Sequence, residues 1–252
     1  MNDNKRGHSI REWLFKQKKE IKLLFHSIPA AVVSLFTISV VAMNLLANKT
    51  IYQSEYLALD GGFLVSWLSF LCMDIITKHY GPRASIRISI FAMLVNLLTC
   101  FIFWIVSIIP ASEEFAAFDQ VIGGTWYVLL SSTIAFLSSG ILNIWLNFFV
   151  GLIFKKNPDG KLAFYTRTYV STFIGQFFDN FIFAIFAFMV FFPIFLGFGW
   201  NLLECFMCSL VGAVFELVCE AVFSPFGYYV TKKWKEEGIG ERYIEYMEEK
   251  RA

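Results

Sequence analysis

The chain has 252 residues, of which 57% are hydrophobic, 19% aromatic and only 16% charged. Soluble domains carry about 25% charged residues, so this composition, with a mean hydropathy of +0.60, excludes an ordinary water-soluble globular protein. The formal net charge of +1 argues neither for nor against nucleic-acid binding, because Lys and Arg are concentrated between the apolar stretches and not within them.

The first segment, residues 1–27, is basic and lies before the first apolar stretch. It lacks the compact apolar core and the small-residue cleavage site of a secretory signal. Apolar residues alternate with lysines between Ile10 and Phe25. This pattern is compatible with an amphipathic helix on the anionic inner leaflet and equally with a solvated cytoplasmic tail.

Six apolar stretches are long enough to cross a bilayer, which requires about 20 predominantly apolar residues. They lie near 28–48, 57–77, 84–109, 126–154, 167–193 and 200–230. Runs of this length exceed ordinary β-strands. We therefore predict an all-α, polytopic membrane protein with a bundle of six transmembrane helices over residues 28–230 and a cytoplasmic tail with a short helix over 231–252.

The distribution of basic residues predicts the orientation of this bundle. Lys and Arg are frequent in the N-terminal tail, in the second and fourth connections and in the C-terminal tail. The first connection has only Lys49, the third is acidic and the fifth is uncharged. By the positive-inside rule, both termini are expected in the cytoplasm, with the chain crossing the bacterial cytoplasmic membrane several times.

Ionisable residues inside the predicted spans are the main candidates for function. At the centre of a bilayer such a residue costs about 2.5–3.5 kcal/mol. Asp179 lies near the middle of the fifth span, close to Gln176, and Glu216 lies at similar depth in the sixth. No Lys or Arg occurs at mid-depth in any span, so we interpret these carboxylates as a proton site, a cation site or the site of a ligand that donates hydrogen bonds.

Amides and aromatic residues in the spans have two open interpretations. Asn44 and Asn48, and likewise Asn143 and Asn147, are four residues apart, which places each pair on one helix face. They either form interhelical hydrogen bonds, each contributing about 0.6 kcal/mol, or line a cavity. Trp67, like other deep aromatic residues, either packs in the bundle or stacks on a flat ring.

Asp74 lies near the cytoplasmic end of the second span, one turn before Lys78 and close to Arg83. An ion pair that fixes the cytoplasmic turn is the preferred role for these three residues. The five cysteines all lie in apolar stretches, and we interpret them as packing residues. No nucleotide-binding, zinc-hydrolase or nucleophile-elbow motif occurs, so we expect no metal site, no cofactor and no catalytic residue.

Four stretches of the chain, in order, resemble motifs of the putative vitamin uptake transporter family. They are Asn44–Lys49, similar to N-x-x-A-x-K; Asp74–Ala84, similar to D-x-x-T-x-x-Y-G-x-x-A-R; Arg167–Asp179, similar to R-x-x-x-S-T-x-x-x-Q-x-x-D; and Ser224–Tyr228, similar to T-P-x-x-Y. The resemblance implies a six-helix bundle that imports queuosine precursors, namely 7-deazaguanines such as 7-cyano-7-deazaguanine. The sequence departs from the family pattern at Trp67, at Lys78 and near Glu216.

The resemblance also suggests roles for individual residues. Asp179 would accept both donors of the guanine-like edge in bidentate fashion, and Gln176 and Asn48 would contact the exocyclic oxygen. Glu216 is the second candidate carboxylate. Asn44, Asn143 and Trp67 complete the substrate-binding set that we predict.

A second hypothesis is a substrate-binding membrane subunit for a vitamin, energised by a separate ATP-driven module, since the chain has no nucleotide site of its own. An intramembrane enzyme and a purely structural protein are less favoured. The expected partners are a purine-like small molecule and the lipid bilayer, without nucleic acid. A homodimer is compatible with this size, although no stretch of the sequence identifies a dimer face.

Overall fold

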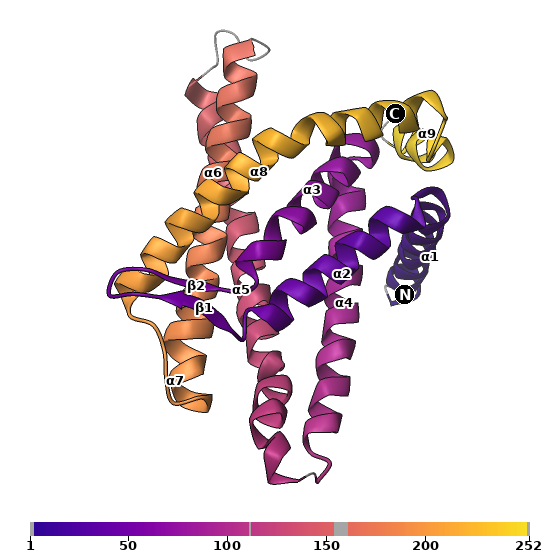
Figure 1. Ribbon diagram of the computed structural model, residues 1–252. Coiled ribbons are helices and arrows are strands. Elements are labelled where there is room, and N and C mark those ends of the chain that lie inside the picture. The colour runs from indigo at the N-terminus through magenta and orange to yellow at the C-terminus, as the bar shows by residue number, and fades with distance from the viewer. Residues whose placement is uncertain (1–2, 111, 154–160, 251–252) are drawn as a thin grey trace.

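The computed structural model describes residues 3–110, 112–153 and 161–250 (Figure 1), and their side chains except at 3–11, 13, 14, 74, 137, 140–153, 161–172, 220 and 224. Nearly all of the described chain is helical, as predicted. The helices are α1 (Asp3–Ser27), α2 (Ala30–Leu46), α3 (Phe63–Tyr80), α4 (Pro82–Ser107), α5 (Ala116–Ile153), α6 (Lys161–Ala184), α7 (Phe192–Phe195), α8 (Leu202–Glu236) and α9 (Glu241–Glu249). Shorter elements are the 3₁₀ turn η1 (Glu113–Phe115), the π-helical segment η2 (Ile185–Phe191) and the strands β1 (Thr50–Gln53) and β2 (Ala58–Asp60).

Each of the six predicted apolar stretches overlaps one long helix or, for the fifth, the continuous run α6–η2–α7. Within the described residues, three helical runs are long and apolar enough to span a membrane, namely Pro82–Ser107, Phe173–Phe195 and Leu202–Phe223. A fourth is added if Phe15–Ser27 and Ala30–Leu46, which are bent by 102°, form one span. The six-span count and the cytoplasmic position of both termini stay predictions.

The long helices form a closed ring. Contacts run from α2 to α3, then to α8, α6, α5 and α4, and back to α2. Further contacts join α3 to α4 and α2 to α5. Because α3 and α8 are in contact although they are distant in sequence, the first and last parts of the bundle meet (Figure 1).

Two buried apolar clusters close the ring at its ends. The first, which includes Leu24, Ile76 and Tyr243, lies where α1 and α9 pack against α2, α3 and α4. The second, which includes Tyr127 and Phe188, lies at the hairpin and α7 end. Burial of apolar surface in these clusters, at about 25 cal/mol per Å², supplies the packing that holds the interior between them.

A β-hairpin that the sequence analysis did not predict precedes α3. Strands β1 and β2 pair antiparallel, so the second helix begins at Phe63 and not near residue 57. The Asp60 carboxylate accepts hydrogen bonds from the backbone N–H of Gly62 (2.7 Å) and of Phe63 (3.3 Å), which satisfies donors at the start of α3. A Cβ on Gly61 would lie 2.7 Å from the Leu46 carbonyl oxygen, so glycine permits the hairpin to pack closely on α2.

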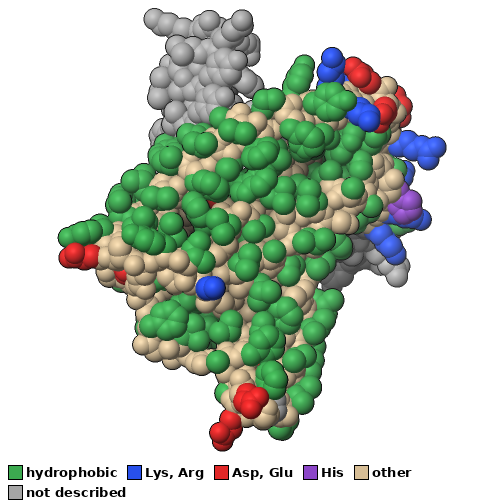
Figure 2. All heavy atoms as spheres, in the orientation of Figure 1, with side chains coloured by type: hydrophobic (Ala, Val, Ile, Leu, Met, Phe, Trp, Pro, Cys, Tyr) green, Lys and Arg blue, Asp and Glu red, His purple; other side chains and the backbone are tan. Residues whose placement is uncertain are grey.

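Surface charge is segregated along the molecule. On the face drawn in Figure 2, hydrophobic side chains cover most of the surface, and Lys and Arg gather at the α8–α9 end. Acidic side chains lie at both ends, among the Lys and Arg of the α8–α9 end and at the opposite tip, where exposed Glu113 and Glu114 connect α4 to α5. This distribution agrees with the predicted positive-inside orientation.

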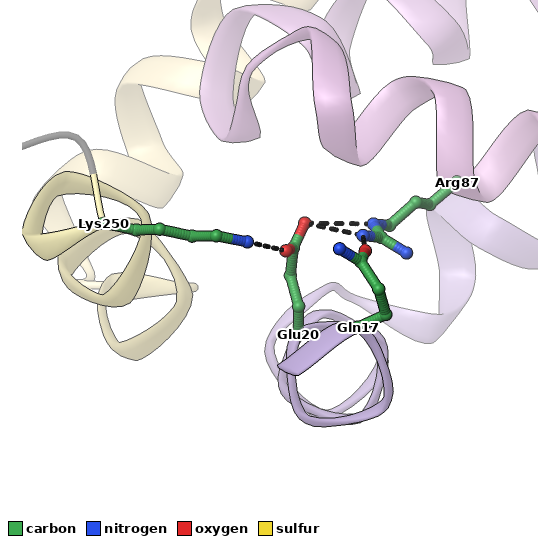
Figure 3. Close-up of polar contacts among 4 residues, drawn as sticks. All are labelled: Gln17, Glu20, Arg87 and Lys250. Carbon is green, nitrogen blue, oxygen red and sulfur yellow. Dashed lines mark hydrogen bonds and ion pairs between the residues drawn. The ribbon is translucent and has the colours of Figure 1, made fainter. Parts of the chain in front are cut away.

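Glu20 joins three segments that are distant in sequence. Its side chain is only 1% exposed and accepts a hydrogen bond from Arg87 Nε at 3.0 Å and from Lys250 Nζ at 2.8 Å. Gln17 accepts a further hydrogen bond from Arg87 (Figure 3). The N-terminal segment is thus a helix fixed to the start of α4 and to the end of α9.

The first prediction concerns this buried ion pair. Burial raises the pKa of Glu20, but the hydrogen bond from Lys250 and the charges of Arg87 and Lys250 outweigh it, so the pKa lies below its ordinary value. Stability from Glu20 is therefore present above the unfolded-state pKa and is lost as pH falls through the folded-state pKa. We expect Glu20→Gln to lower the free energy of unfolding by about 2 kcal/mol at neutral pH and by much less below pH about 4.

Thermal unfolding of the detergent-solubilised protein at both pH values checks this expectation. The control is Glu236→Gln, because Glu236 forms an exposed pair with Lys232 at 3.8 Å, which contributes less than about 1 kcal/mol. Equal losses for Glu20→Gln and the control would show that the buried pair has no special role.

Candidate functional site

A cavity of about 340 Å³ lies inside the helix ring, between the two apolar clusters. Ligand pockets typically have about 300–1,000 Å³, so its size suits a small molecule. Every helix of the ring contributes to its wall, with Asn44 from α2, Trp67 from α3, Asn96 from α4, Ser139 from α5, Gln176 and Asp179 from α6, and Glu216 from α8.

Two carboxylates face this cavity. Asp179 Oδ1 accepts a hydrogen bond from Ser139 Oγ at 2.6 Å, and Glu216 Oε2 accepts one from Asn180 Nδ2 at 3.4 Å. Among the residues whose side chains are described, no Lys or Arg forms an ion pair with either carboxylate. Each therefore keeps oxygen lone pairs that a hydrogen-bond donor inside the cavity can reach.

Three buried amides in the same wall have unused hydrogen-bonding atoms. The side chains of Asn44, Asn96 and Gln176 are 2%, 1% and 8% exposed, and all three line the cavity. Among the described residues, Asn44 Nδ2, Asn96 Nδ2 and Gln176 Oε1 have no hydrogen-bond partner. Since an unsatisfied buried polar group costs about 1–3 kcal/mol, the wall is suited to a polar solute with both donors and acceptors.

Aromatic rings form another part of the wall. Trp67 is stacked on Phe223 with ring centroids 4.5 Å apart and an interplanar angle of 13°. Its indole Nε1 donates a hydrogen bond to the Leu64 carbonyl at 3.0 Å. The orientation of Trp67 is therefore fixed by neighbours on its own side of the cavity, and Phe70 lines the cavity beside it.

A smaller compartment of about 70 Å³ adjoins the same carboxylates. It shares Asp179, Glu216, Asn44 and three apolar or hydroxyl residues with the main cavity, and residues such as Asp60 and Asn180 line it at the hairpin side. The two carboxylates thus lie at the junction between the main cavity and the end closed by the hairpin.

The structure brings most of the predicted substrate-binding residues together. Asp179, Gln176, Glu216, Asn44 and Trp67 line the one cavity. Their assignment as substrate ligands stays a prediction, but all five surround one cavity whose volume suits a small molecule.

One predicted residue does not join this group, and the side chain of another is not described. Asn48 lines neither compartment, because its Nδ2 donates to the Leu45 carbonyl (3.1 Å) and to Thr125 Oγ1 (3.4 Å). Asn143 is in α5, and its side chain lies outside the described residues. Asn44 is therefore the amide that α2 presents to the cavity.

The predicted cytoplasmic turn lies between α3 and α4. Gly81, with φ of +85°, ends α3, and Pro82 occupies the first turn of α4, so backbone preferences already define the turn. The Asp74 side chain lies outside the described residues, Arg83 is exposed and Lys78 reaches the edge of the cavity. The ion pair expected there stays a prediction.

Sequence reasoning missed Asn96 and Ser139. Asn96 is the only amide in its apolar stretch, and that isolation was a usable signal. The sequence contains no signal for Ser139, because serine is common in helices of this kind and because its partner Asp179 is 40 positions away along the chain.

Sequence comparison identifies one family. The family described as "Putative vitamin uptake transporter" matches residues 60–230, which is more than half of the chain and includes five of the six helices that line the cavity. No curated protein and no solved structure matches the chain.

The second prediction tests the unused amides. Replacing Asn96 with Leu removes a buried polar group that has no partner among the described residues, so we expect the free energy of unfolding to rise by about 1 kcal/mol. The matched control is Asn180→Leu, which leaves Glu216 without its amide donor and should lower the free energy by about 1–3 kcal/mol. Thermal unfolding of both variants without substrate shows whether the free energy of unfolding rises or falls in each. A decrease for Asn96→Leu similar to that of the control would contradict the prediction.

Proposed function

The chain belongs to the putative vitamin uptake transporter family, and from this premise we propose that it imports a queuosine precursor across the bacterial cytoplasmic membrane. The substrate class that we propose is a 7-deazaguanine such as 7-cyano-7-deazaguanine. The observation that supports it is the single cavity that combines two carboxylates, three partly unsatisfied amides and an ordered indole.

The hydrogen-bonding groups of this substrate complement those of the wall. A guanine-like edge presents N1–H and an exocyclic amine side by side, and one carboxylate accepts both. We assign this role to Asp179, whose Oδ1 is oriented by Ser139. Glu216, held by Asn180, is the second candidate for the same role.

The remaining polar atoms of the base have matching partners. The exocyclic oxygen needs a donor, which Asn44 Nδ2 and Asn96 Nδ2 can supply, and a pyrrole N–H needs an acceptor such as Gln176 Oε1. Each amide is buried, so hydrogen bonds formed there are shielded from competing water. A vitamin without this donor–acceptor pattern would leave several of these groups unsatisfied.

The flat ring of the base fits beside Trp67. Stacking of a base on an aromatic side chain contributes about 1–3 kcal/mol. Because Phe223 and the Leu64 carbonyl already fix the indole, little side-chain entropy is lost when the base binds.

The third prediction tests Asp179. In cells that cannot make queuosine, supplied precursor should restore queuosine in transfer RNA when the protein is expressed. Asp179→Asn replaces one of two acceptors by a donor and should reduce uptake at least about fivefold, since a bidentate contact discriminates by about 1–3 kcal/mol. The control is Asp119→Asn, at the start of α5 and outside the cavity lining, compared at equal protein levels in the membrane.

Two results would count against these assignments. Transfer RNA that stays unmodified with the wild-type protein would exclude the proposed substrate. Normal uptake by Asp179→Asn with loss of uptake by Glu216→Gln would move the ligand role to Glu216.

The fourth prediction tests the stacking wall. Trp67→Phe keeps an aromatic face and should change the affinity for 7-cyano-7-deazaguanine by less than about fivefold, whereas Trp67→Ala should weaken it by about fivefold to a hundredfold. Titration calorimetry of the purified protein measures both. Equal affinity of the two variants would show that the base does not stack there.

The alternative function is a binding subunit for a vitamin that depends on a separate ATP-driven module. Purified protein in liposomes, without ATP or other proteins, separates the two. Uptake of labelled precursor under these conditions supports an autonomous transporter, and uptake that appears only with a nucleotide-binding partner supports the alternative.

A further inference from the structure

Most of the charged side chains that the structure describes in helix α1 are exposed. Glu20 and Leu24, one turn apart, are buried, whereas Lys16, Lys18 and Lys22 are exposed. The helix has seven Lys and Arg residues, namely Lys5, Arg6, Arg11, Lys16, Lys18, Lys19 and Lys22. Lys18 and Lys22, also one turn apart, share the side opposite Glu20 and Leu24, and Lys16 lies one turn before Glu20; we call these three exposed lysines the basic face.

The direction of α1 places it across the end of the bundle. The run Phe15–Ser27 is bent by 102° from Ala30–Leu46, with Pro29 at the junction. If α2 crosses the bilayer, as predicted, a helix at this angle lies nearly parallel to the membrane plane.

The contacts of α1 with α4 indicate how deep α1 lies relative to the membrane. The ring of Phe25 lies edge-on to that of Phe91, with centroids 5.0 Å apart. Phe91 belongs to the apolar run Pro82–Ser107, which is long enough to span a membrane. Glu20 is paired with Arg87, one turn nearer the start of the same helix (Figure 3). These contacts place α1 where α4 enters the apolar layer.

The surroundings of the lysines also suit an interface between lipid and water. Phe15 is 71% exposed and Ile21 is 40% exposed, so large apolar side chains lie among the charges. Helices that rest on a membrane combine basic and large apolar residues in this way. The pair formed by Glu20 and Lys250 holds the helix in place, so the basic face needs no folding step to meet a charged surface.

We propose that the basic face of α1 binds the anionic phospholipid headgroups of the leaflet that α2 and α4 enter. Each Lys or Arg held near an anionic membrane surface contributes roughly a fivefold gain in binding. Headgroups are the occupant that fits, because the bend and the contact between Phe25 and Phe91 place the lysines beside the bilayer and not out in solution. This inference does not depend on the transported substrate.

The test uses the full chain in nanodiscs of phosphatidylcholine alone or of phosphatidylcholine mixed with an equal part of phosphatidylglycerol. We expect hydrogen–deuterium exchange of the amides of Phe15–Ser27 to be at least about fivefold slower with the anionic lipid, and added salt to reduce the difference. The variant Lys16→Gln/Lys18→Gln/Lys22→Gln should abolish it. The control variant Lys232→Gln/Lys233→Gln/Lys235→Gln removes the same charge from the last turn of α8 and should preserve it.

Three results would overturn the proposal. Equal exchange in both lipids would show that α1 is protected by protein contacts alone. A lipid effect that survives in the α1 variant would place the anion site elsewhere. Protection that requires added RNA and not anionic lipid would assign the basic face to nucleic acid.

Discussion

Polar groups that the protein itself leaves unsatisfied are the constraint on which the interior depends. Asp179 accepts a hydrogen bond from Ser139 and Glu216 accepts one from Asn180, and neither forms an ion pair with a described Lys or Arg. Three orphaned amide atoms in the same wall cost about 1–3 kcal/mol each. This sum is comparable with the whole net stability of a typical domain, about 5–15 kcal/mol. The two apolar clusters must offset it, and a ligand that satisfies these groups would stabilise the fold.

The ring of helices explains why these groups meet. Contacts between α3 and α8 and between α6 and α8 close the ring and bring residues from both halves of the chain to one wall. Such contacts depend on helix order and rotation, which periodicity does not encode. The sequence could therefore predict that Asp179, Glu216 and Trp67 lie deep in helices, and the resemblance could suggest a shared site. That Asn96 and Ser139 also line this site could not be predicted, because it depends on how the helices are arranged.

Asn44 and Asn48 show where helical periodicity no longer predicts which residues share a face. Residues four apart share a face only while the helix continues, and α2 ends at Leu46. Asn48 therefore lies past the last turn and binds backbone carbonyls and Thr125. The hairpin β1–β2 escaped prediction for a related reason: its second strand, Ala58–Asp60, is only three residues long and gives no recognisable alternation.

The two ends of the cavity differ in a way that bears on transport. The wall continues along α3 to Lys78 and along α8 to Gly227, toward the basic end of the molecule. At the other end Trp200 is stacked on Phe188, with centroids 3.9 Å apart, and Gln53 donates a hydrogen bond to Glu204 at 2.9 Å. If this end faces outward, as the distribution of basic residues predicts, a protein that takes up its substrate from outside must separate these contacts to admit it. These contacts involve the hairpin and η2, a π-helical segment, which is a rare conformation found mostly at functional sites. Asp179 and Glu216 lie beside them on the long helices α6 and α8.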